Sequence, residues 1–292
     1  MPQSSTSLSS TLTLSPLVER LIRLAIEEDI GSGDITSQEF IPPDTLACAR
    51  IVARENCIFA GNFIVDSILN QVDERLSAIF FVKDGDSLIK GQSAIEVKGP
   101  ARAILSAERT LLNFLQHLTA IATTTRRYID EIKGTTARLL DTRKTTPGWR
   151  ELEKAAVLAG GGKNHRMGLY DMAMLKDNHL AAQSSHEALA KNLLAFRKKY
   201  PDIPIEIEAD TLEQVRFFAG LPEVDFILLD NMPPAQIREA LKHRREGLCF
   251  EASGGITLKT IRSIAETGVD FISIGALTHS ATSVDLGMDW KN

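Results

Sequence analysis

Six short apolar runs in the second half of the chain each stop at polar residues or at glycine. These runs are ARLL (137–140), MAML (172–175), IPIEI (203–207), DFILL (225–229), CFEA (249–252) and DFISI (270–274). Intervals of 33, 32, 22, 23 and 22 residues separate the residues that follow them, which are Arg143, Lys176, Glu208, Asp230, Ser253 and Gly275. A strand, a loop and a helix need a stretch of that order. The pattern predicts repeated βα units that form a barrel and collect their strand ends at one mouth.

The N-terminal part of the chain has a different pattern. Residues 16–28 predict an amphipathic helix, and the sequence DIGSGD (29–34) predicts a loop. Between 46 and 98, the segments ACARIVA, NCIFAG, SAIFFV and SAIEV predict strands of an antiparallel sheet, with a helix near 62–73. One long helix with an apolar stripe then covers 101–133. The KDGD and IKGQ turns resemble those of lipoyl-type carriers, but a tight sheet corner is the better interpretation because no modifiable Lys stands at a hairpin tip.

We therefore expect an α/β protein with two domains. An α+β domain covers 16–120 and an α/β barrel, the catalytic domain, covers 121–276, with helices at 211–219, 233–245 and 257–267 between its last strands. Residues 1–15 are rich in Ser and Thr and are interpreted as a disordered extension. The tail 277–292 has no strong pattern, which leaves open whether it packs on the first domain.

Composition narrows the class of protein. The chain has 292 residues, a net charge of −5, and ordinary contents of hydrophobic (43%) and charged (24%) residues. General binding to nucleic acid or to an anionic membrane is therefore not expected. Cys48, Cys57 and Cys249 lack metal or redox spacing, and no secretory signal, transit peptide or transmembrane run is present. We expect reduced thiols and a cytoplasmic protein.

Positive charge is concentrated in the segment 142–179, which carries seven Lys and Arg against four Asp and Glu. A basic segment on an acidic chain indicates a focused anion site. Arg143 and Lys144 directly follow a predicted strand, and Lys176 closes another, where an unpaired ammonium is costly. For the stretch from Arg150 to Lys154, however, we prefer a solvated helix face.

The sequence DTRKTTPGWRELEKAAVLAGGGKNHRMGLYDMAMLKDNH (141–179) resembles the signature of the quinolinate phosphoribosyltransferase family. Further matches follow in family order at EDIGSGDIT (28–36), AERTLLNFLQHLTAIAT (107–123), IEIEADTLEQ (205–214), ILLDN (227–231) and EASGGIT (251–257). The resemblance implies an N-terminal open α+β sandwich followed by an incomplete, TIM-like α/β barrel. It also implies a pentosyltransferase of NAD biosynthesis, which converts quinolinate and phosphoribosyl pyrophosphate to nicotinate mononucleotide, pyrophosphate and carbon dioxide with magnesium.

The resemblance assigns roles to particular residues. Arg143, His165, Arg166 and Lys176 are expected to bind the carboxylates of quinolinate or adjacent phosphates, with help from Lys144 and Thr145. The loops Ser253-Gly254-Gly255 and Gly275-Ala276 are expected to hold the 5′-phosphate, because backbone N–H groups after the last barrel strands face anions. Glu208 and Asp230 suit the ribose hydroxyls, a magnesium-bound water, or both. The residues expected to take part in catalysis are Lys144, Lys176, Glu208 and Asp230.

The family works as a two-fold dimer, in some members assembled into hexamers, and Arg109 is expected to reach the partner's site. On its own, Arg109 is also compatible with a surface side chain on an amphipathic helix. Three other functions stay open: a Schiff-base aldolase acting through Lys176, a homologue from molybdenum operons with another substrate, and an inactive anion-binding module. For Glu208 and Asp230, structural neutralisation of nearby cations is the alternative.

Overall fold

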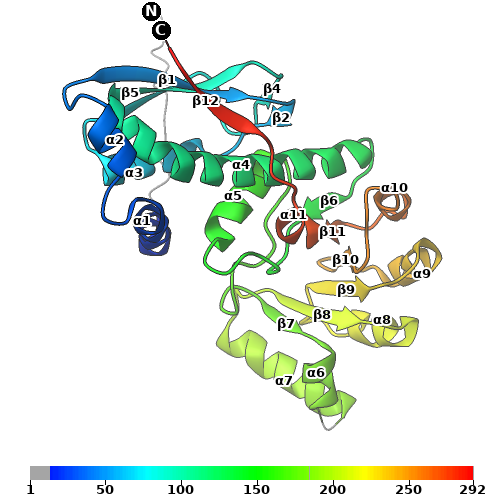
Figure 1. Cartoon of the computed structure of the whole chain (residues 1–292). Helices are drawn as coiled ribbons and strands as arrows, with labels where there is room; N and C mark the ends of the chain where they lie inside the picture. The colour runs from blue at the N-terminus through cyan, green and yellow to red at the C-terminus, as the bar shows by residue number, and fades with distance from the viewer. Residues whose placement is uncertain (1–13, 184, 292) are drawn as a thin grey trace, which may run out of the picture. The chain divides into compact units, whose positions relative to one another are not determined.

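The computed structural model of the chain describes residues 14–183 and 185–291. They belong to two compact units: unit 1 comprises the described residues up to Ala120 together with 283–291, and unit 2 comprises the described residues from Ile121 to Thr282. Figure 1 shows the elements of both. The expected disordered extension at 1–15 lies outside the described residues, except for Leu14 and Ser15.

Unit 1 is built on an antiparallel sheet with the strand order β12-β1-β5-β3. Its strands are β1 (Leu46–Ala53), β3 (Ser77–Phe80), β5 (Ser93–Pro100) and β12 (Leu286–Trp290), and a separate ribbon pairs β2 (Cys57–Ile58) with β4 (Ser87–Leu88). In β12, Met288 pairs with Ile51 of β1. The strand β12 thus adds an edge strand to unit 1, whereas the residues from Ile121 to Thr282 belong to unit 2.

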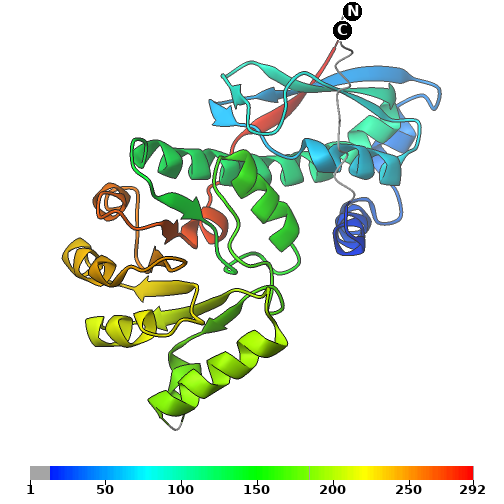
Figure 2. The ribbon, with the colours of Figure 1, turned by 180° about the vertical axis from the view of Figure 1, so that it is seen from behind.

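The helices of unit 1 are α1 (Pro16–Ile30), α2 (Ile35–Phe40), α3 (Asn62–Val72) and α4 (Ala101–Glu131), the last of which continues into unit 2. Two of these helices, α1 and α2, begin at side-chain caps. The Ser15 hydroxyl accepts a hydrogen bond from Val18 N, and the Asp34 carboxylate accepts one from Ser37 N. In Figure 2 the first part of α4 runs along one face of the sheet. Apolar side chains of that helix, such as Ile104, are fully buried there.

Unit 2 contains a six-stranded parallel sheet with the order β6-β11-β10-β9-β8-β7. Each predicted apolar run supplies one strand: β6 (Arg138–Leu140), β7 (Ala173–Leu175), β8 (Ile205–Ala209), β9 (Phe226–Asp230), β10 (Cys249–Ser253) and β11 (Phe271–Ser273). The strands β6 and β7 stand at opposite ends of this order, so the sheet is not closed within the described residues. The expected α/β class and incomplete barrel are confirmed.

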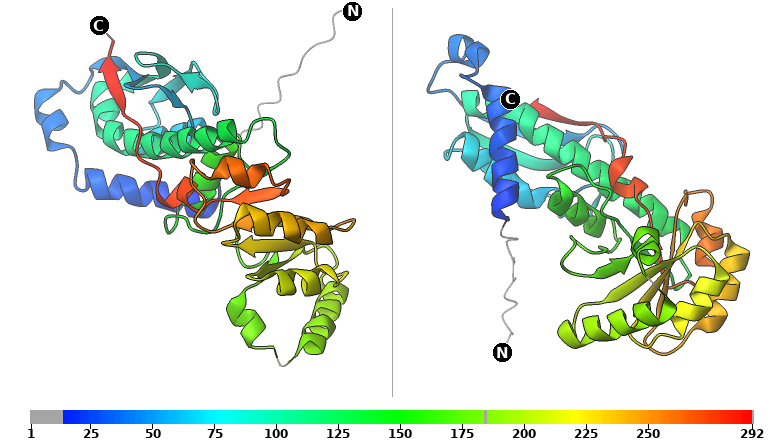
Figure 3. Two further views of the ribbon diagram at one scale, coloured as in Figure 1. Left: turned by 90° about the vertical axis from the view of Figure 1, so that its right-hand side faces the viewer. Right: turned by 90° about the horizontal axis from the view of Figure 1, so that it is seen from below.

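Helical segments follow each strand of the sheet in unit 2. They are α5 (Arg150–Ala159), α6 (Asp177–Ala181), α7 (His186–Lys199), α8 (Leu212–Ala219), α9 (Pro234–Ala240), the short 3₁₀ helix η1 (Leu241–His243), α10 (Ile261–Ala265) and α11 (Ala276–His279). Figure 3 shows α8, α9 and α10, coloured yellow to orange, outside the strands. The helix predicted at 257–267 is shorter, and a turn in which Thr257 N donates to the Thr260 hydroxyl precedes it. Among the described helices, none has the length and apolarity needed to span a bilayer.

Candidate active site

The site lies at the carboxyl-terminal ends of the parallel strands of unit 2. Leu228 of β9 stands in register with Glu208 of β8 on one side and Glu251 of β10 on the other. Two residues further along, Asp230 stands in register with Ser253. Because side chains alternate between the two faces of a strand, these residues all belong to one face of the sheet.

A cavity of about 500 Å³ opens at this edge of the sheet. It is lined by ten residues that the sequence predicted to bind substrate, namely Arg143, Lys144, His165, Arg166, Lys176, Glu208, Asp230, Ser253, Gly254 and Gly255. Six lining residues were not predicted: Thr142, Met174, Leu228, Asn231, Glu251 and Ser273. Cations and acids from separate strand ends therefore converge in a single space.

Four predicted site residues do not line this cavity. Thr145 lies beside it, where its hydroxyl accepts a hydrogen bond from Arg150 Nε (3.1 Å). Gly275 and Ala276 begin α11, and a Cβ placed on Gly275 would lie only 2.8 Å from Lys144 Cδ. That residue therefore allows the close approach of a cavity lysine. Arg109 belongs to unit 1, where its side chain is exposed on α4.

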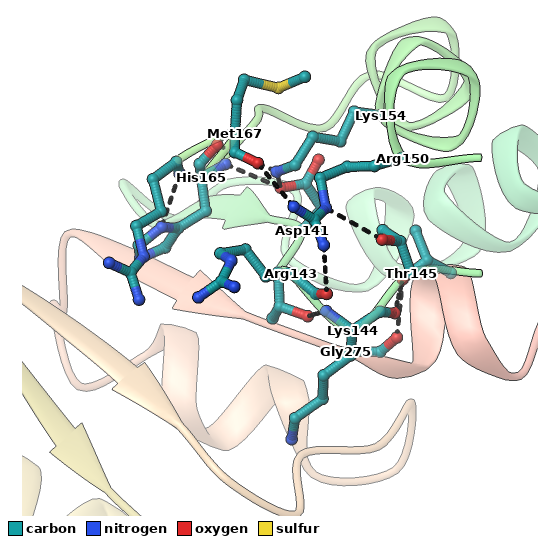
Figure 4. Close-up of polar contacts among 12 residues, drawn as sticks. Asp141, Arg143, Lys144, Thr145, Arg150, Lys154, His165, Met167 and Gly275 are labelled. Atoms are coloured by element: carbon teal, nitrogen blue, oxygen red, sulfur yellow. Dashed lines mark hydrogen bonds and ion pairs between the residues drawn. The ribbon is translucent and has the colours of Figure 1, made fainter. Parts of the chain in front are cut away.

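Arg150, the first residue of α5, joins the two loops that carry the cations. Its Nε donates to Thr145 Oγ1, and its terminal nitrogens donate to Met167 O (3.0 Å) and Arg143 O (3.5 Å). Figure 4 shows the guanidinium between these acceptors. The interpretation of this residue as part of a solvated helix face is wrong. A planar fork with five donors reaches several acceptors, which an ammonium cannot do with the same geometry.

Lys154 also contradicts the expected solvated face, because its side chain is only 1% exposed. Its ammonium forms an ion pair with Asp141 and donates to His165 O (3.0 Å). The Asp141 carboxylate in turn accepts from His165 N (2.8 Å) and, with the amide suitably oriented, from Asn164 Nδ2 (2.7 Å). Burial raises the pKa of Asp141 and lowers that of Lys154, and their mutual attraction opposes both shifts. The pair holds the backbone of the loop 163–166 from inside unit 2.

The cavity carries more positive than negative charge along its loops. Burial, together with the neighbouring positive charge of Arg143, lowers the pKa of Arg166. Lys144 is exposed at the same side of the cavity. Cations held close together by fixed backbone repel one another, and an anionic ligand relieves that repulsion.

Acids gather at the ends of β8 and β9. Lys176 Nζ lies 2.8 Å from Glu208 Oε2, with the two side chains 45% and 12% exposed. Carboxylate oxygens of Glu208, Asp210 and Asp230 all lie within 4.8 Å of one another. Hard oxygen ligands of this kind suit Mg²⁺. The sequence prediction of Glu208 and Asp230 as metal residues thus gains a third acid, Asp210, that it had left out.

The turn after β10 requires glycine for two separate reasons. Gly254 and Gly255 have φ angles of +93° and +61°, in the left-handed region. A Cβ on Gly254 would also stand 2.2 Å from Asn231 Oδ1. Asn231 itself has a φ of 53° and donates its backbone N–H to Ser253 O (2.8 Å). Consecutive N–H groups in such turns form concave anion sites.

Two buried acids, Glu206 of β8 and Glu251 of β10, lie beneath the cavity beside His165. Their side chains are 0% and 1% exposed, and their Oε2 atoms lie 3.0 Å and 3.5 Å from His165 Nε2. Sequence reasoning missed both as functional residues. The available signal was an acid inside each of the apolar runs IPIEI and CFEA, because a charge in a buried strand needs a partner.

Comparisons with known proteins indicate the same family for the N-terminal and the C-terminal part of the chain. The family models named quinolinate phosphoribosyl transferase match at residues 34–119 for the N-terminal domain and 121–289 for the C-terminal domain. The chain is 44% identical to a probable nicotinate-nucleotide pyrophosphorylase [carboxylating] of Bacillus subtilis, over 93% of each chain. It is 41% identical to the carboxylating nicotinate-nucleotide pyrophosphorylase of Mycobacterium leprae, over 92% of this chain and 95% of that one.

Solved structures give the same result. The nicotinate-nucleotide pyrophosphorylase of Francisella tularensis is similar with a TM-score of 0.87 and 36% identity, covering 94% of this chain and 96% of that one. The Ehrlichia chaffeensis enzyme of the same name is similar with a TM-score of 0.87 and 36% identity, covering 96% and 100%.

Proposed function

This chain belongs to the quinolinate phosphoribosyltransferase family, and on that premise we propose that the cavity at the end of the parallel sheet is its active site. The enzyme transfers the phosphoribosyl group of phosphoribosyl pyrophosphate to quinolinate and releases pyrophosphate and carbon dioxide, giving nicotinate mononucleotide. The observation that carries the assignment of the site is the convergence of Arg143, Arg166 and Lys176 with Glu208 and Asp230 in one cavity.

Quinolinate is held through its two carboxylates. Arg143 and Arg166 come from different loops at the same side of the cavity, and each guanidinium can donate two parallel hydrogen bonds to a carboxylate. Lys176 adds a point charge from the end of β7. Each charge-assisted hydrogen bond of this kind contributes roughly 1.5–3 kcal/mol, so the loss of one donor costs about one to two decades in binding.

The sugar and its phosphates occupy the remaining part of the cavity. Glu208 and Asp230 accept hydrogen bonds from the ribose hydroxyls, while Lys144 and Lys176 compensate the charge of the departing pyrophosphate. Thr145 supports the Lys144 loop through Arg150. The 5′-phosphate binds to the Ser253-Gly254-Gly255 turn, whose positive φ angles support this role. Gly275 and Ala276 contribute by leaving room for Lys144.

Magnesium is part of the proposal, and the donor set on the acidic side of the cavity fits it. Glu208, Asp210 and Asp230 would hold the ion, directly or through water, because only oxygen ligands are present and they lie close together. When bound, magnesium supplies charge compensation to the pyrophosphate oxygens.

The chemistry follows from the charges that these residues hold in place. The quinolinate nitrogen forms a bond to the anomeric carbon as the bond from that carbon to the pyrophosphate oxygen breaks. The ring nitrogen becomes positive. The bond to the adjacent carboxylate then breaks, carbon dioxide leaves, and the electron pair left on the ring carbon takes up a proton. The neighbouring positive nitrogen stabilises that electron pair, so the decarboxylation needs no general base from the cavity.

A homodimer completes the proposal. Arg109 is exposed on α4, which supports its role as a cation supplied to the site of a second copy. Further assembly into a hexamer is compatible with this arrangement. A reducing compartment, such as the cytoplasm, is supported by the three cysteines, all of which are free thiols.

The decisive experiment follows nicotinate mononucleotide from quinolinate, phosphoribosyl pyrophosphate and magnesium. Nicotinic acid should not replace quinolinate, because it lacks one carboxylate and the decarboxylating carbon. If quinolinate gives no product, the proposed function is wrong. If borohydride traps a carbonyl substrate on Lys176, the aldolase function is correct instead.

The shared site has its own test. Arg109→Ala and Lys176→Ala proteins should each be inactive, and their mixture should regain part of the activity after subunit exchange. Exchange is measured independently with differently tagged chains. Exchange without any regained activity would refute the contribution of Arg109 across the interface.

A further inference from the structure

The His165 side chain is only 7% exposed, and both nitrogens of its ring face protein groups. Its Nδ1 accepts a hydrogen bond from the backbone N–H of the next residue, Arg166 (2.7 Å). Its Nε2 faces Glu206 Oε2 at 3.0 Å and Glu251 Oε2 at 3.5 Å. The ring therefore has no free nitrogen to offer a substrate carboxylate.

The hydrogen bond to Nδ1 determines where the ring proton resides. A backbone N–H only donates, so Nδ1 must present its lone pair and the proton of the neutral imidazole must sit on Nε2. A second proton on Nδ1 would break the bond from Arg166. A metal ion on Nε2 would need the lone pair that this tautomer uses for its proton. The arrangement favours a neutral imidazole that donates toward the two acids.

Charged groups around the ring act in opposite directions. Burial lowers the pKa of His165, but the contact with Glu206 and the negative charge of Glu251 outweigh burial and raise it. Lys154 lowers it, and Asp141 on the other side of the loop is also close enough to interact. The hydrogen bond to Nδ1 decides between these opposing effects, because only the neutral ring can accept it from Arg166 N.

The two acids beneath the ring lie close together, because a carboxylate oxygen of each and a ring nitrogen of His165 are all within 4.8 Å of one another. Both oxygens of Glu206 and Oε1 of Glu251 are buried without an aligned hydrogen-bond partner in the described part of the chain. Burial, and then the charge of Glu206, raises the pKa of Glu251 to about 8. His165 Nε2 lies closer to Glu206 Oε2 (3.0 Å) than to Glu251 Oε2 (3.5 Å), so Glu206 is the nearer acceptor for the Nε2–H.

We propose that His165 is a positioning residue that aims Arg166 at the substrate, and that it does not itself bind quinolinate. This inference rests on the proposed function for the identity of the substrate. The imidazole joins the Arg166 backbone to the buried Glu206–Glu251 pair, while Asp141 and Lys154 hold the backbone of His165 itself. Arg166 Nη1 donates to Met172 O (3.2 Å), which leaves its other guanidinium nitrogens for a carboxylate. The role expected for His165 from the sequence is revised accordingly.

The first test observes the ring directly in the full-length protein. Protein labelled with ¹⁵N-histidine is compared with His165→Gln, so that the His165 signals are identified by their loss. At neutral pH, Nε2 should be protonated and Nδ1 unprotonated, both without ligand and with quinolinate. A protonated Nδ1, or a change of protonation when quinolinate binds, would overturn the proposal. If His165→Gln does not fold, His165→Asn provides the assignment.

The second test is a double-mutant cycle on quinolinate affinity, measured by calorimetry. His165→Gln should weaken binding about tenfold in the wild-type background. In the Arg166→Ala background it should weaken binding by less than about twofold, because a residue that acts through Arg166 has nothing left to position. If His165 bound quinolinate directly, His165→Gln would weaken binding equally in both backgrounds. Arg166→Lys replaces Arg166→Ala if binding by the latter is too weak to measure.

Lys144→Ala is the matched control for the cycle, because Lys144 lines the cavity without a bond to Arg166, and its effect should persist in both backgrounds. Failure of the proposed function can be distinguished from failure of the role proposed for His165. If the wild-type protein does not bind quinolinate, the proposed function fails, whereas the protonation state of His165 in the ligand-free protein still decides the present inference.

Discussion

Lys154 and Asp141 form an ion pair inside unit 2 with side chains only 1% and 0% exposed, and each also bonds to the main chain of His165. The pair therefore connects α5 and the end of β6 with the loop that carries His165 and Arg166. Charges of this kind are costly to bury, so their value depends on the complete set of partners.

Replacement of Lys154 by Met should destabilise the protein by about 3–5 kcal/mol, because Asp141 remains buried as an uncompensated charge. Urea unfolding measures the change. Lys242→Met is the matched control, since Lys242 pairs with Glu239 on the surface at 67% and 54% exposure and should change stability by at most about 1 kcal/mol. Equal effects of the two substitutions would contradict this account.

Arg150→Met should lower kcat/KM by about one to two decades while the protein stays folded, because the two cationic loops lose their common anchor. Arg150→Lys should recover only part of the activity, since an ammonium cannot reach all three acceptors at the same time. Arg238→Met, on the exposed face of α9, controls for the loss of a cation. Wild-type kinetics in Arg150→Met would show that the loops are fixed by other contacts.

Gly254→Ala should raise the KM for phosphoribosyl pyrophosphate strongly, because the added methyl group displaces Asn231 and distorts the turn. Gly247→Ala is the control, since Gly247 also has a positive φ (+76°) but a Cβ there meets no atom within 4 Å. Both substitutions should cost about 1–2 kcal/mol of stability from backbone strain. Only Gly254→Ala should impair catalysis, and similar kinetics in both variants would exclude the turn from the phosphate site.

Asp210→Asn should raise the magnesium concentration needed for half-maximal activity by about tenfold, because one of three converging carboxylates loses its charge. The titration is carried out at saturating substrate. Asp202→Asn, exposed before β8, should leave the magnesium dependence unchanged. An unchanged dependence in Asp210→Asn would limit the metal residues to Glu208 and Asp230.

Glu251→Gln should flatten the dependence of stability on pH. The pKa of Glu251 is raised from 4.5 to about 8, so the folded protein holds a proton that the unfolded chain releases above 4.5. The contribution of this group to stability is therefore complete below 4.5 and decreases as pH rises toward 8. Glutamine mimics the protonated acid and removes this decrease, whereas Glu246→Gln, on the surface, should keep it. Urea unfolding midpoints measured across the pH range test this prediction.

Much of the fold and part of the site follow from local patterns in the sequence. Each apolar run became a strand because a parallel strand is buried on both faces and needs consecutive apolar residues. The residue after the run then necessarily reaches the common edge, which is why Lys176, Glu208 and Asp230 were identified before their neighbours were known. The family signature added the roles that periodicity alone does not contain.

The sequence predictions were incorrect or incomplete where the position of a side chain depends on a partner from another element. Lys154 resembled a surface cation because its partner, Asp141, lies 13 residues earlier on a different element. Glu206 and Glu251 were counted as parts of strands, since nothing local shows that they meet beneath His165. The helix predicted at 257–267 is present but shorter, at Ile261–Ala265, because periodicity does not locate the turn that precedes it.

The pairing of β12 with β1 sets an order for events during synthesis. Unit 2 is one continuous stretch, so all of it has been synthesised before β12 is made. The barrel can form as soon as its own residues are available, whereas the N-terminal sheet waits for its edge strand. The N-terminal domain, most of which is synthesised first, is thus the last to receive all of its strands.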